Sequence, residues 1–145
     1  MIFHINRMTF KSGLSEEQRQ ACLDAARQAG EANSAVRSYA VGRELGGEFK
    51  WSAVYVVDDL DGYWEYLTHP AHVRSEIMGM ELIERFEAVD VTDSDGPEVG
   101  EKIARLQARH FEESPELAAL VAQVPSFKVP DSTGQPPAAS GQAQA

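Results

Sequence analysis

The chain has 145 residues, 43% of them hydrophobic and 25% charged, which is typical of one globular domain and too short for two well-filled ones. Its formal net charge of −10 argues against binding to nucleic acids or to anionic membrane surfaces, because both need a basic face. No apolar stretch approaches the roughly 20 residues that span a bilayer, and the first residues lack the pattern of a signal peptide. The single cysteine, Cys22, cannot form an intrachain disulfide, so we expect a cytoplasmic protein.

The chain begins with a predicted strand and a predicted helix. Residues 2–10 are rich in β-forming residues and carry apolar side chains on both faces. A helix is predicted to start after Ser15, whose hydroxyl can form a capping box with Gln18, and to stop near Gly30. Small side chains line its apolar face, so we expect this helix to lie close to the layer that it covers.

The next two predicted strands, residues 36–42 and 49–58, form a hairpin around the glycine-rich turn at residues 45–47. The second of these strands places large apolar side chains on both faces, and a sheet of this kind must be covered on both faces. The predicted helices can cover one face. We therefore predict that a second copy of the chain covers the other face, which gives a homodimer.

A short helix capped by Asp58 and Asp59 is predicted next, and Pro70 interrupts it because the residue before a proline disfavours helical backbone. A further helix is predicted from about residue 71 to 84, followed by the last strand at residues 86–92. The predicted order up to this point is therefore strand, helix, strand, strand, helix, strand.

Two amphipathic helices are predicted beyond this strand, one from residue 99 to 110 and one after the Ser114-Pro115 pair. We expect them to pack on the body of the protein or on a partner. From residue 128 onward the chain is mostly Pro, Gln, Ala, Ser and Gly, which cannot bury enough apolar surface to fold. The expected organisation is a domain at residues 1–92, a helical extension at 93–127 and a disordered tail at 128–145.

Candidate chemistry concentrates in the segment from Tyr66 to His72, where a phenol and two imidazoles, including His69, surround Pro70. With its ordinary pKa of about 6.5, an imidazole can take a proton from a carbon acid near neutral pH. A nearby phenol can donate a hydrogen bond to the enolate oxygen that results. Such a pair suffices for an aldol or Claisen-type cyclisation without a metal or cofactor. The competing interpretation is that both histidines cap helix ends and that Tyr66 fills the core.

Other polar residues give weaker signals. His4 and Asn6 share one face of the first strand and could line a cavity, although a core histidine with a partner would look the same. His69 and His72, with Glu76 one turn further, have the spacing of metal ligands, but no further Cys or His is placed to complete a site, so we expect no metal. The sequence also lacks the common hydrolase, phosphate-binding, dinucleotide-binding and metalloprotease motifs.

The Y-x-x-H-P-A-H segment at residues 66–72 resembles the stress-responsive α/β-barrel domain family, called Dabb. An early histidine, a first helix that opens with Ser-Glu-Glu and the strand at residues 36–39 before a glycine-rich turn add to the resemblance, which covers residues 1–92. The resemblance implies an α+β subunit with the ferredoxin-like order βαββαβ, and a dimer whose two sheets form an α+β barrel. The C-terminal helical extension lies outside it.

The residues from Tyr66 to Thr92 are also similar to the plant polyketide cyclase branch of this family, the olivetolic acid cyclases. Those enzymes carry out an intramolecular aldol condensation on a linear poly-β-keto thioester. The similarity implies that His72 is the general base and that Tyr66 binds the carbonyl group. The residues that we expect in the substrate-binding wall are His4, Asn6, Cys22, Leu23, Ala26, His69 and Ile83.

Three of these wall positions, Cys22, Leu23 and Ala26, take the place of bulky aromatic side chains in the plant enzymes. Smaller walls leave more room, so a bulkier or multi-ring substrate would fit better than a short alkyl chain. Alternatively, part of the tail fills that space and leaves no cavity.

We therefore expect a cofactor-independent small-molecule enzyme of the lyase type, namely a homodimeric, polyketide cyclase-like protein. The alternative is a non-catalytic, stress-responsive scaffold homodimer whose tail helices dock a partner. A cofactor-free monooxygenase, with Trp51 and Trp64 lining its site, is a third possibility. The cavity distinguishes the first two: an open pocket of roughly a few hundred Å³ favours the enzyme, and a filled core favours the scaffold.

Overall fold

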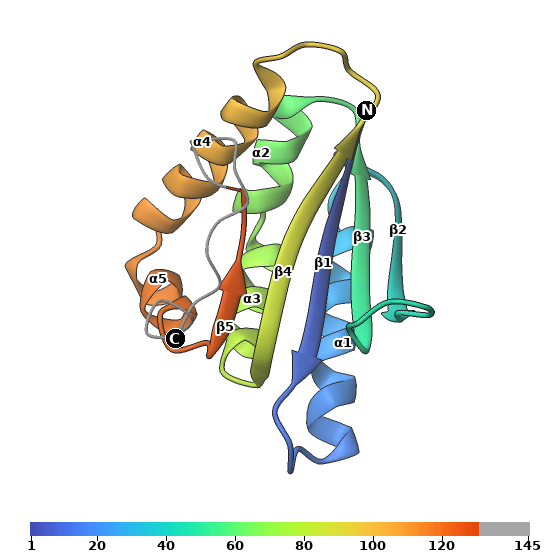
Figure 1. Cartoon of the computed structure of the whole chain (residues 1–145), viewed down its shortest axis with the longest axis vertical. Coiled ribbons are helices and arrows are strands. Elements are labelled where there is room, and N and C mark those ends of the chain that lie inside the picture. Colours follow the sequence, from blue (N-terminus) through green and yellow to red (C-terminus); the bar gives the residue numbers. More distant parts are fainter. Residues whose placement is uncertain (131–145) are drawn as a thin grey trace.

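The structure of the chain is a computed structural model that describes residues 1–130 (Figure 1). These residues form five strands and five helices: β1 (Ile2–Phe10), α1 (Glu16–Glu31), β2 (Val36–Arg43), β3 (Trp51–Val57), α2 (Leu60–Thr68), α3 (Pro70–Met80), β4 (Ile83–Thr92), α4 (Val99–Glu112), α5 (Pro115–Val121) and β5 (Ser126–Lys128). Within this part of the chain, no helix is both long and apolar enough to cross a membrane.

The strands form one sheet in the order β2-β3-β1-β4-β5. Strand β1 runs antiparallel to both β3 and β4, whereas β5 pairs with β4 in parallel. Up to β4 the element order is the predicted βαββαβ, with α2 and α3 together in the place of the second helix. The chain therefore has the predicted α+β ferredoxin-like fold, with additional elements after β4.

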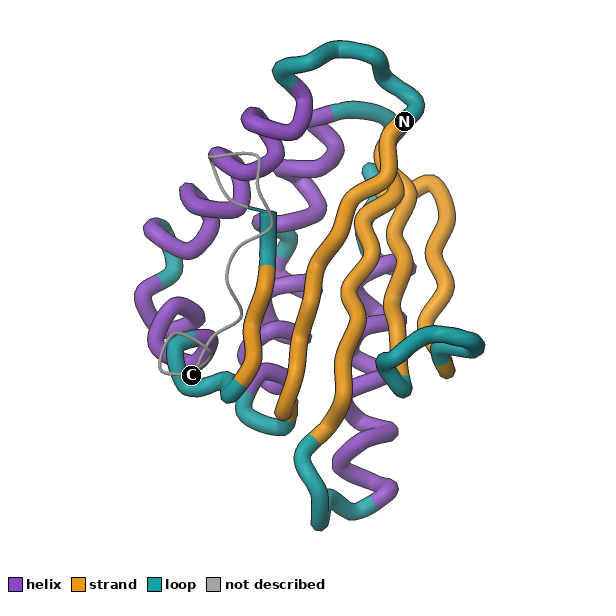
Figure 2. The backbone as a smooth tube through the Cα atoms, viewed as in Figure 1, coloured by secondary structure: helices purple, strands orange, loops and turns teal. Residues whose placement is uncertain are grey.

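Figures 1 and 2 show helices α1, α2 and α3 behind one face of the sheet. Side chains alternate accordingly along β1, where Ile2, His4 and Met8 are buried and Phe3 is 39% exposed. Between residues 1 and 130 no helix covers the opposite face, which we call the open face. The prediction that the helices of one chain cover a single face is therefore confirmed for the described residues.

The core between the sheet and the helices is unusually rich in tyrosine. Its largest fully buried side chains are those of Tyr55, Tyr63, Tyr66, Leu23, Leu67, Leu117 and Val57. Burial of each such side chain contributes about 1.5–3 kcal/mol to folding. Because a buried tyrosine needs a partner for its hydroxyl group, these residues also bring polar atoms into the core.

Local signals in the sequence explain how α1 forms and how closely it packs. The predicted capping box is present, since the backbone N–H of Gln18 donates to Ser15 Oγ at 3.1 Å and Ser15 N–H donates back to Gln18 Oε1 at 3.0 Å. A Cβ atom at Gly79 in α3 would lie 3.0 Å from Sγ of Cys22 in α1. The two helices thus approach each other through small residues.

The chain turns sharply between α2 and α3. His69 ends α2, and its Nδ1 accepts a hydrogen bond from the backbone N–H of Ala71 at 3.1 Å, which caps α3. The predicted boundaries after this point are wrong: α3 ends at Met80, and β4 begins at Ile83 rather than at residue 86. The strand extends further because Ile83 pairs with Phe10 beyond an irregularity in the register of β1.

One residue of the strand predicted at residues 49–58 lies outside the observed strand. Phe49 precedes β3 and is 2% exposed, between the guanidinium groups of Arg7 and Arg85. These groups lie 4.5 and 4.4 Å from the centre of its ring, which is cation–π distance. The two arginines on the open face can therefore stabilise Phe49 in a buried position although it lies outside strand β3.

The elements after β4 pack on the body of the protein. Ile103 of α4, Leu117 of α5, and Val124 and Phe127 belong to the same core cluster as the sheet. Strand β5 was not predicted; it pairs with β4 at Phe86, and the rings of Phe86 and Phe127 stack at 5.2 Å. Lys128, expected to open the disordered tail, is the last residue of β5. The rest of that tail, residues 131–145, lies outside the described residues.

Candidate active site

A cavity of about 60 Å³ lies between the sheet and the helices. Seven of the predicted site residues line this site cavity: His4, Asn6, Cys22, Ala26, Tyr66, His72 and Ile83. Its volume holds a few water molecules, whereas sites for small-molecule ligands typically measure roughly 300–1,000 Å³. The expectation of extra room for a bulky substrate is therefore wrong for this conformation. The large side chains of Met8, Met80 and Phe86 also line the cavity.

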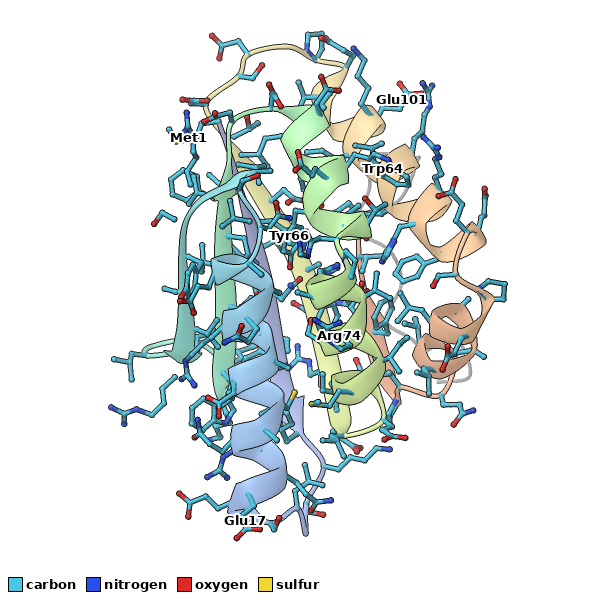
Figure 3. The ribbon with its side chains drawn as sticks, turned by 180° about the vertical axis from the view of Figure 1, so that it is seen from behind. Met1, Glu17, Trp64, Tyr66, Arg74 and Glu101 are labelled. Atoms are coloured by element: carbon cyan, nitrogen blue, oxygen red, sulfur yellow. The ribbon has the colours of Figure 1, made fainter. Side chains whose placement is uncertain are left out.

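The turn at Pro70 brings the predicted catalytic pair together. Tyr66 in the last turn of α2 is fully buried, and Figure 3 places it between α2 and the strands behind it. The centre of its ring lies 4.3 Å from that of His72 and 5.5 Å from that of His4. Burial raises the pKa of Tyr66 well above its ordinary value, so its hydroxyl group keeps its proton and can donate a hydrogen bond.

The surroundings of His72 fix the position of its ring protons. Nδ1 lies 2.8 Å from the carbonyl oxygen of Leu67 and 2.9 Å from Oε1 of Glu76. A carbonyl oxygen can only accept, so Nδ1 carries a proton and, in the neutral ring, Nε2 does not. Within residues 1–130, Nε2 of His72 has no hydrogen-bond partner, and the ring lines the site cavity. Nε2 is therefore available as a base.

Glu76 is the carboxylate behind this histidine. Burial by itself would raise the pKa of Glu76, but electrostatic attraction and hydrogen bonds from His72 and His110 outweigh burial and lower the pKa to about 2. Nε2 of His110 lies 2.7 Å from Oε1 of Glu76. Glu76 is therefore ionised at neutral pH and accepts hydrogen bonds from both imidazole rings.

A second histidine–carboxylate pair lies on the opposite wall. Nδ1 of His4 is 2.8 Å from Oδ1 of Asp90, and the hydroxyl group of Tyr63 donates to Oδ2 of Asp90 at 3.1 Å. Gln107 of α4 in turn donates to the Tyr63 oxygen at 2.9 Å. Sequence reasoning missed Asp90, Tyr63 and Gln107. The register of β1 against β4, in which His4 directly opposes Asp90, is the signal that could have found the pair.

Two predicted wall residues are absent from the site cavity. Leu23 is buried in the core but does not line the cavity, and His69 caps α3 as the competing interpretation expected. Trp51 and Trp64, named for a monooxygenase site, do not line it either. Trp64 instead lies under the guanidinium group of Arg109, on the outer side of α2.

One cluster has the donor set of a metal site. His72, Glu76 and His110 each offer an atom within 4.8 Å of the others, and two imidazoles with a carboxylate are typical zinc ligands. Sequence reasoning named His69, His72 and Glu76 and found no further histidine, because His110 lies in the helical extension. In the observed arrangement, however, Nδ1 of His72 carries a proton that it donates to Leu67, and a metal ion at this nitrogen would have to displace that proton.

The sequence model of the Stress responsive A/B Barrel Domain, or Dabb, matches residues 2–93. None of the curated proteins matches this sequence significantly.

Among solved structures, a dimeric ferredoxin-like protein of unknown function from Thermobifida fusca is 23% identical, covers 63% of this chain and 89% of its own, and has a TM-score of 0.57. A dimeric ferredoxin-like protein of unknown function from Bacteroides fragilis is 25% identical, with coverages of 62% and 93% and a TM-score of 0.51. A hydroxynitrile lyase from Passiflora edulis is 13% identical, with coverages of 66% and 94% and a TM-score of 0.58. For the proteins from Thermobifida fusca and Passiflora edulis, at 23% and 13% identity, the likeness concerns the fold alone.

Proposed function

The chain belongs to the stress responsive A/B barrel domain (Dabb) family, and from this premise we propose that it is an acid–base enzyme that forms or breaks a carbon–carbon bond next to a carbonyl group. The observation that carries the proposal is the convergence of Tyr66 and His72 on one cavity, with ring centres 4.3 Å apart. Nδ1 of His72 is held by Leu67 and Glu76, which leaves Nε2 as the base.

The reaction in this proposal needs no metal or cofactor. Nε2 of His72 takes the acidic proton from a carbon between two carbonyl groups, and the hydroxyl group of Tyr66 donates a hydrogen bond to the enolate oxygen. The enolate carbon then attacks a second carbonyl group, and the new alkoxide takes the proton back from His72. Glu76 stabilises the imidazolium that exists between the two proton transfers.

An aldol-type cyclisation of a polyketide-like chain is the more specific form of this proposal. A cavity of about 60 Å³ takes only the reacting carbonyl groups. A longer chain therefore requires the helix layer to move away from the sheet, or the remainder of the substrate to lie outside the cavity. Substrate discrimination then depends on the walls formed by Cys22, Ala26 and Ile83.

A second candidate function is supported by the small size of the cavity. With Tyr66 fully buried, the same residues can form the polar core of a non-catalytic homodimer. Ile103 and Leu117 of the tail helices are buried in the body of the protein, so these side chains cannot be the docking surface in this candidate.

A cyclisation assay with a linear poly-β-keto thioester tests the proposal, with the ring product measured by mass spectrometry. We expect Tyr66→Phe to lower the rate roughly 100-fold and His72→Ala to lower it at least as much, since general bases contribute about 10²–10⁴-fold. Tyr39→Phe is the matched control, because Tyr39 does not line the cavity. Equal turnover in Tyr66→Phe, His72→Ala and the wild type would contradict the enzyme proposal.

A further inference from the structure

Helix α4 carries two buried polar residues on one side. Gln107 is 4% exposed and His110 is 2% exposed, and a spacing of three residues places them on the same face of a helix. This face also carries the buried Ile103. Apolar side chains at positions 107 and 110 would therefore pack equally well. A buried imidazole and a buried amide cost free energy unless they form specific hydrogen bonds.

Each of these side chains donates a hydrogen bond to a residue that contacts one of the two cavity histidines, His72 and His4. Nε2 of His110 lies 2.7 Å from Glu76, the carboxylate on Nδ1 of His72. Gln107 Nε2 donates at 2.9 Å to Tyr63, whose hydroxyl group donates to the carboxylate on Nδ1 of His4. One turn of one helix thus connects to both histidine–carboxylate pairs of the site.

Helix α4 itself is held in a defined place. Ile103 and Ala104 are buried, and the guanidinium group of Arg109 lies 4.3 Å from the ring centre of Trp64 in α2. Its outward charges pair along the helix, as in Arg105 with Glu101. Figure 1 shows α4 beside α2, outside the layer formed by the family domain, which ends at residue 93.

We propose that α4 is a positioning element of the active site, in which His110 fixes Glu76 and His72 while Gln107 fixes Tyr63, Asp90 and His4. The inference rests on the proposed function, because it assigns the two histidines their chemistry. A buried carboxylate with one donor can rotate or take up water, whereas a carboxylate with two donors holds one orientation. His110 does not line the site cavity, and Gln107, which does, donates its Nε2 proton to Tyr63. In this proposal both residues act through the two histidines.

Proton exchange at the two imidazole rings tests this role without any substrate. Nitrogen-edited NMR spectra report how fast the Nδ1 proton of each histidine exchanges with water. Loss of one hydrogen bond worth about 1.4 kcal/mol corresponds to roughly 10-fold faster exchange. We expect His110→Leu to accelerate exchange at His72 about 10-fold and leave His4 unchanged. Gln107→Leu is expected to do the reverse.

Two further variants separate positioning from packing. His110→Gln keeps a donor for Glu76 and should retain most of the protection at His72. Arg105→Leu changes the outer side of α4, where this side chain pairs with Glu101, and should change neither histidine. Unchanged exchange in both Leu variants, with folding verified by circular dichroism, would overturn the proposal. Equal acceleration in His110→Leu and His110→Gln would also contradict it, because the donated hydrogen bond would then be irrelevant.

Two additional measurements separate this inference from its rivals. Once a substrate is turned over, the Leu variants should lower kcat roughly 10- to 100-fold with KM unchanged. If no substrate is found, the exchange rates still decide the positioning role. Titration with Co²⁺ tests whether the cluster of His72, Glu76 and His110 binds a metal. We expect no visible absorption bands that appear in the wild type and are absent in His110→Leu. Such bands would mean that His72, Glu76 and His110 act as metal ligands and would replace the positioning role.

Discussion

At the scale of the residue, the proton on Nδ1 of His72 sets the chemistry of the site. The carbonyl oxygen of Leu67, 2.8 Å away, requires a donor and so selects the tautomer in which Nε2 is a base. Because of the same contact, a metal ion at Nδ1 of His72 would have to displace its proton. The position of one backbone carbonyl group, at the end of α2, thus favours acid–base chemistry over metal chemistry.

Cys22 gives a prediction at this scale. Burial raises the pKa of its thiol to about 11, and the residue is 5% exposed, although it lines the site cavity. Only the thiolate reacts with iodoacetamide, so at pH 8 we expect alkylation of the folded protein to be at least about 100-fold slower than that of the urea-unfolded chain. Mass spectrometry over time measures both rates. Comparable rates would mean that the cavity opens to solvent much more often than this structure indicates.

At the scale of the element, the carboxylate of Glu44 connects the loop between β2 and β3 to the open face of the sheet by hydrogen bonds. Arg7 in β1 donates to Glu44 through Nε at 2.8 Å and Nη2 at 2.7 Å, and Ser52 donates to the same group at 2.7 Å. Hydrogen bonds from Arg7, followed by those from Ser52 and the backbone, lower the pKa of Glu44 to about 2. Bidentate pairing with arginine orders a loop that has no regular structure of its own.

This pairing predicts how stability depends on pH. A folded-state pKa of about 2, below the ordinary 4.5, means that the contribution of Glu44 is present above pH 4.5 and is lost as the pH falls toward 2. We expect Glu44→Gln to lower the free energy of unfolding at pH 7 by about 1–3 kcal/mol. From pH 7 to pH 3, the variant should lose less stability than the wild type.

Urea denaturation at both pH values measures these differences. Glu84→Gln is the control, because the exposed Glu84 has no ion pair among the described residues. Parallel loss of stability in the wild type and Glu44→Gln would show that this carboxylate does not control the acid transition.

At the scale of the whole molecule, the open face bears two rows of apolar side chains. In one row Phe3 of β1 pairs with Val56 of β3 and Val91 of β4, and in the next Ile5 lies between Val54 and Val89. Phe3, Val89 and Val91 are 39%, 40% and 56% exposed. A contiguous apolar face of this kind marks an interface.

We therefore predict a homodimer that forms sheet against sheet. Val89→Lys places a charge in the middle of this face and should convert the protein to a monomer, because an unpaired buried charge costs several kcal/mol. Light scattering coupled to gel filtration measures the mass of each species. Met78→Lys, a similar change on the helix side at a residue that is 41% exposed, should leave the dimer intact. A dimer that persists in Val89→Lys would place the interface elsewhere.

Local signals in the sequence determined the elements that depend on neighbouring residues. The capping box at Ser15, the break at Pro70 and the two-sided apolar pattern of β1 follow from steric and hydrogen-bonding rules over a few residues, so the ferredoxin-like order could be predicted. The resemblance in the segment from Tyr66 to His72 also identified the pair that faces the cavity.

Only the tertiary structure decided which groups form hydrogen bonds to the cavity histidines and to Glu76. Asp90 and His110 lie 86 residues from His4 and 34 residues from Glu76, and no local pattern couples such positions. Strand β5 likewise depends on the stacking of Phe127 on Phe86. The sequence of a three-residue segment does not predict such a contact. The cavity is the space that side chains from seven elements leave unfilled, so its volume exists only in the folded chain.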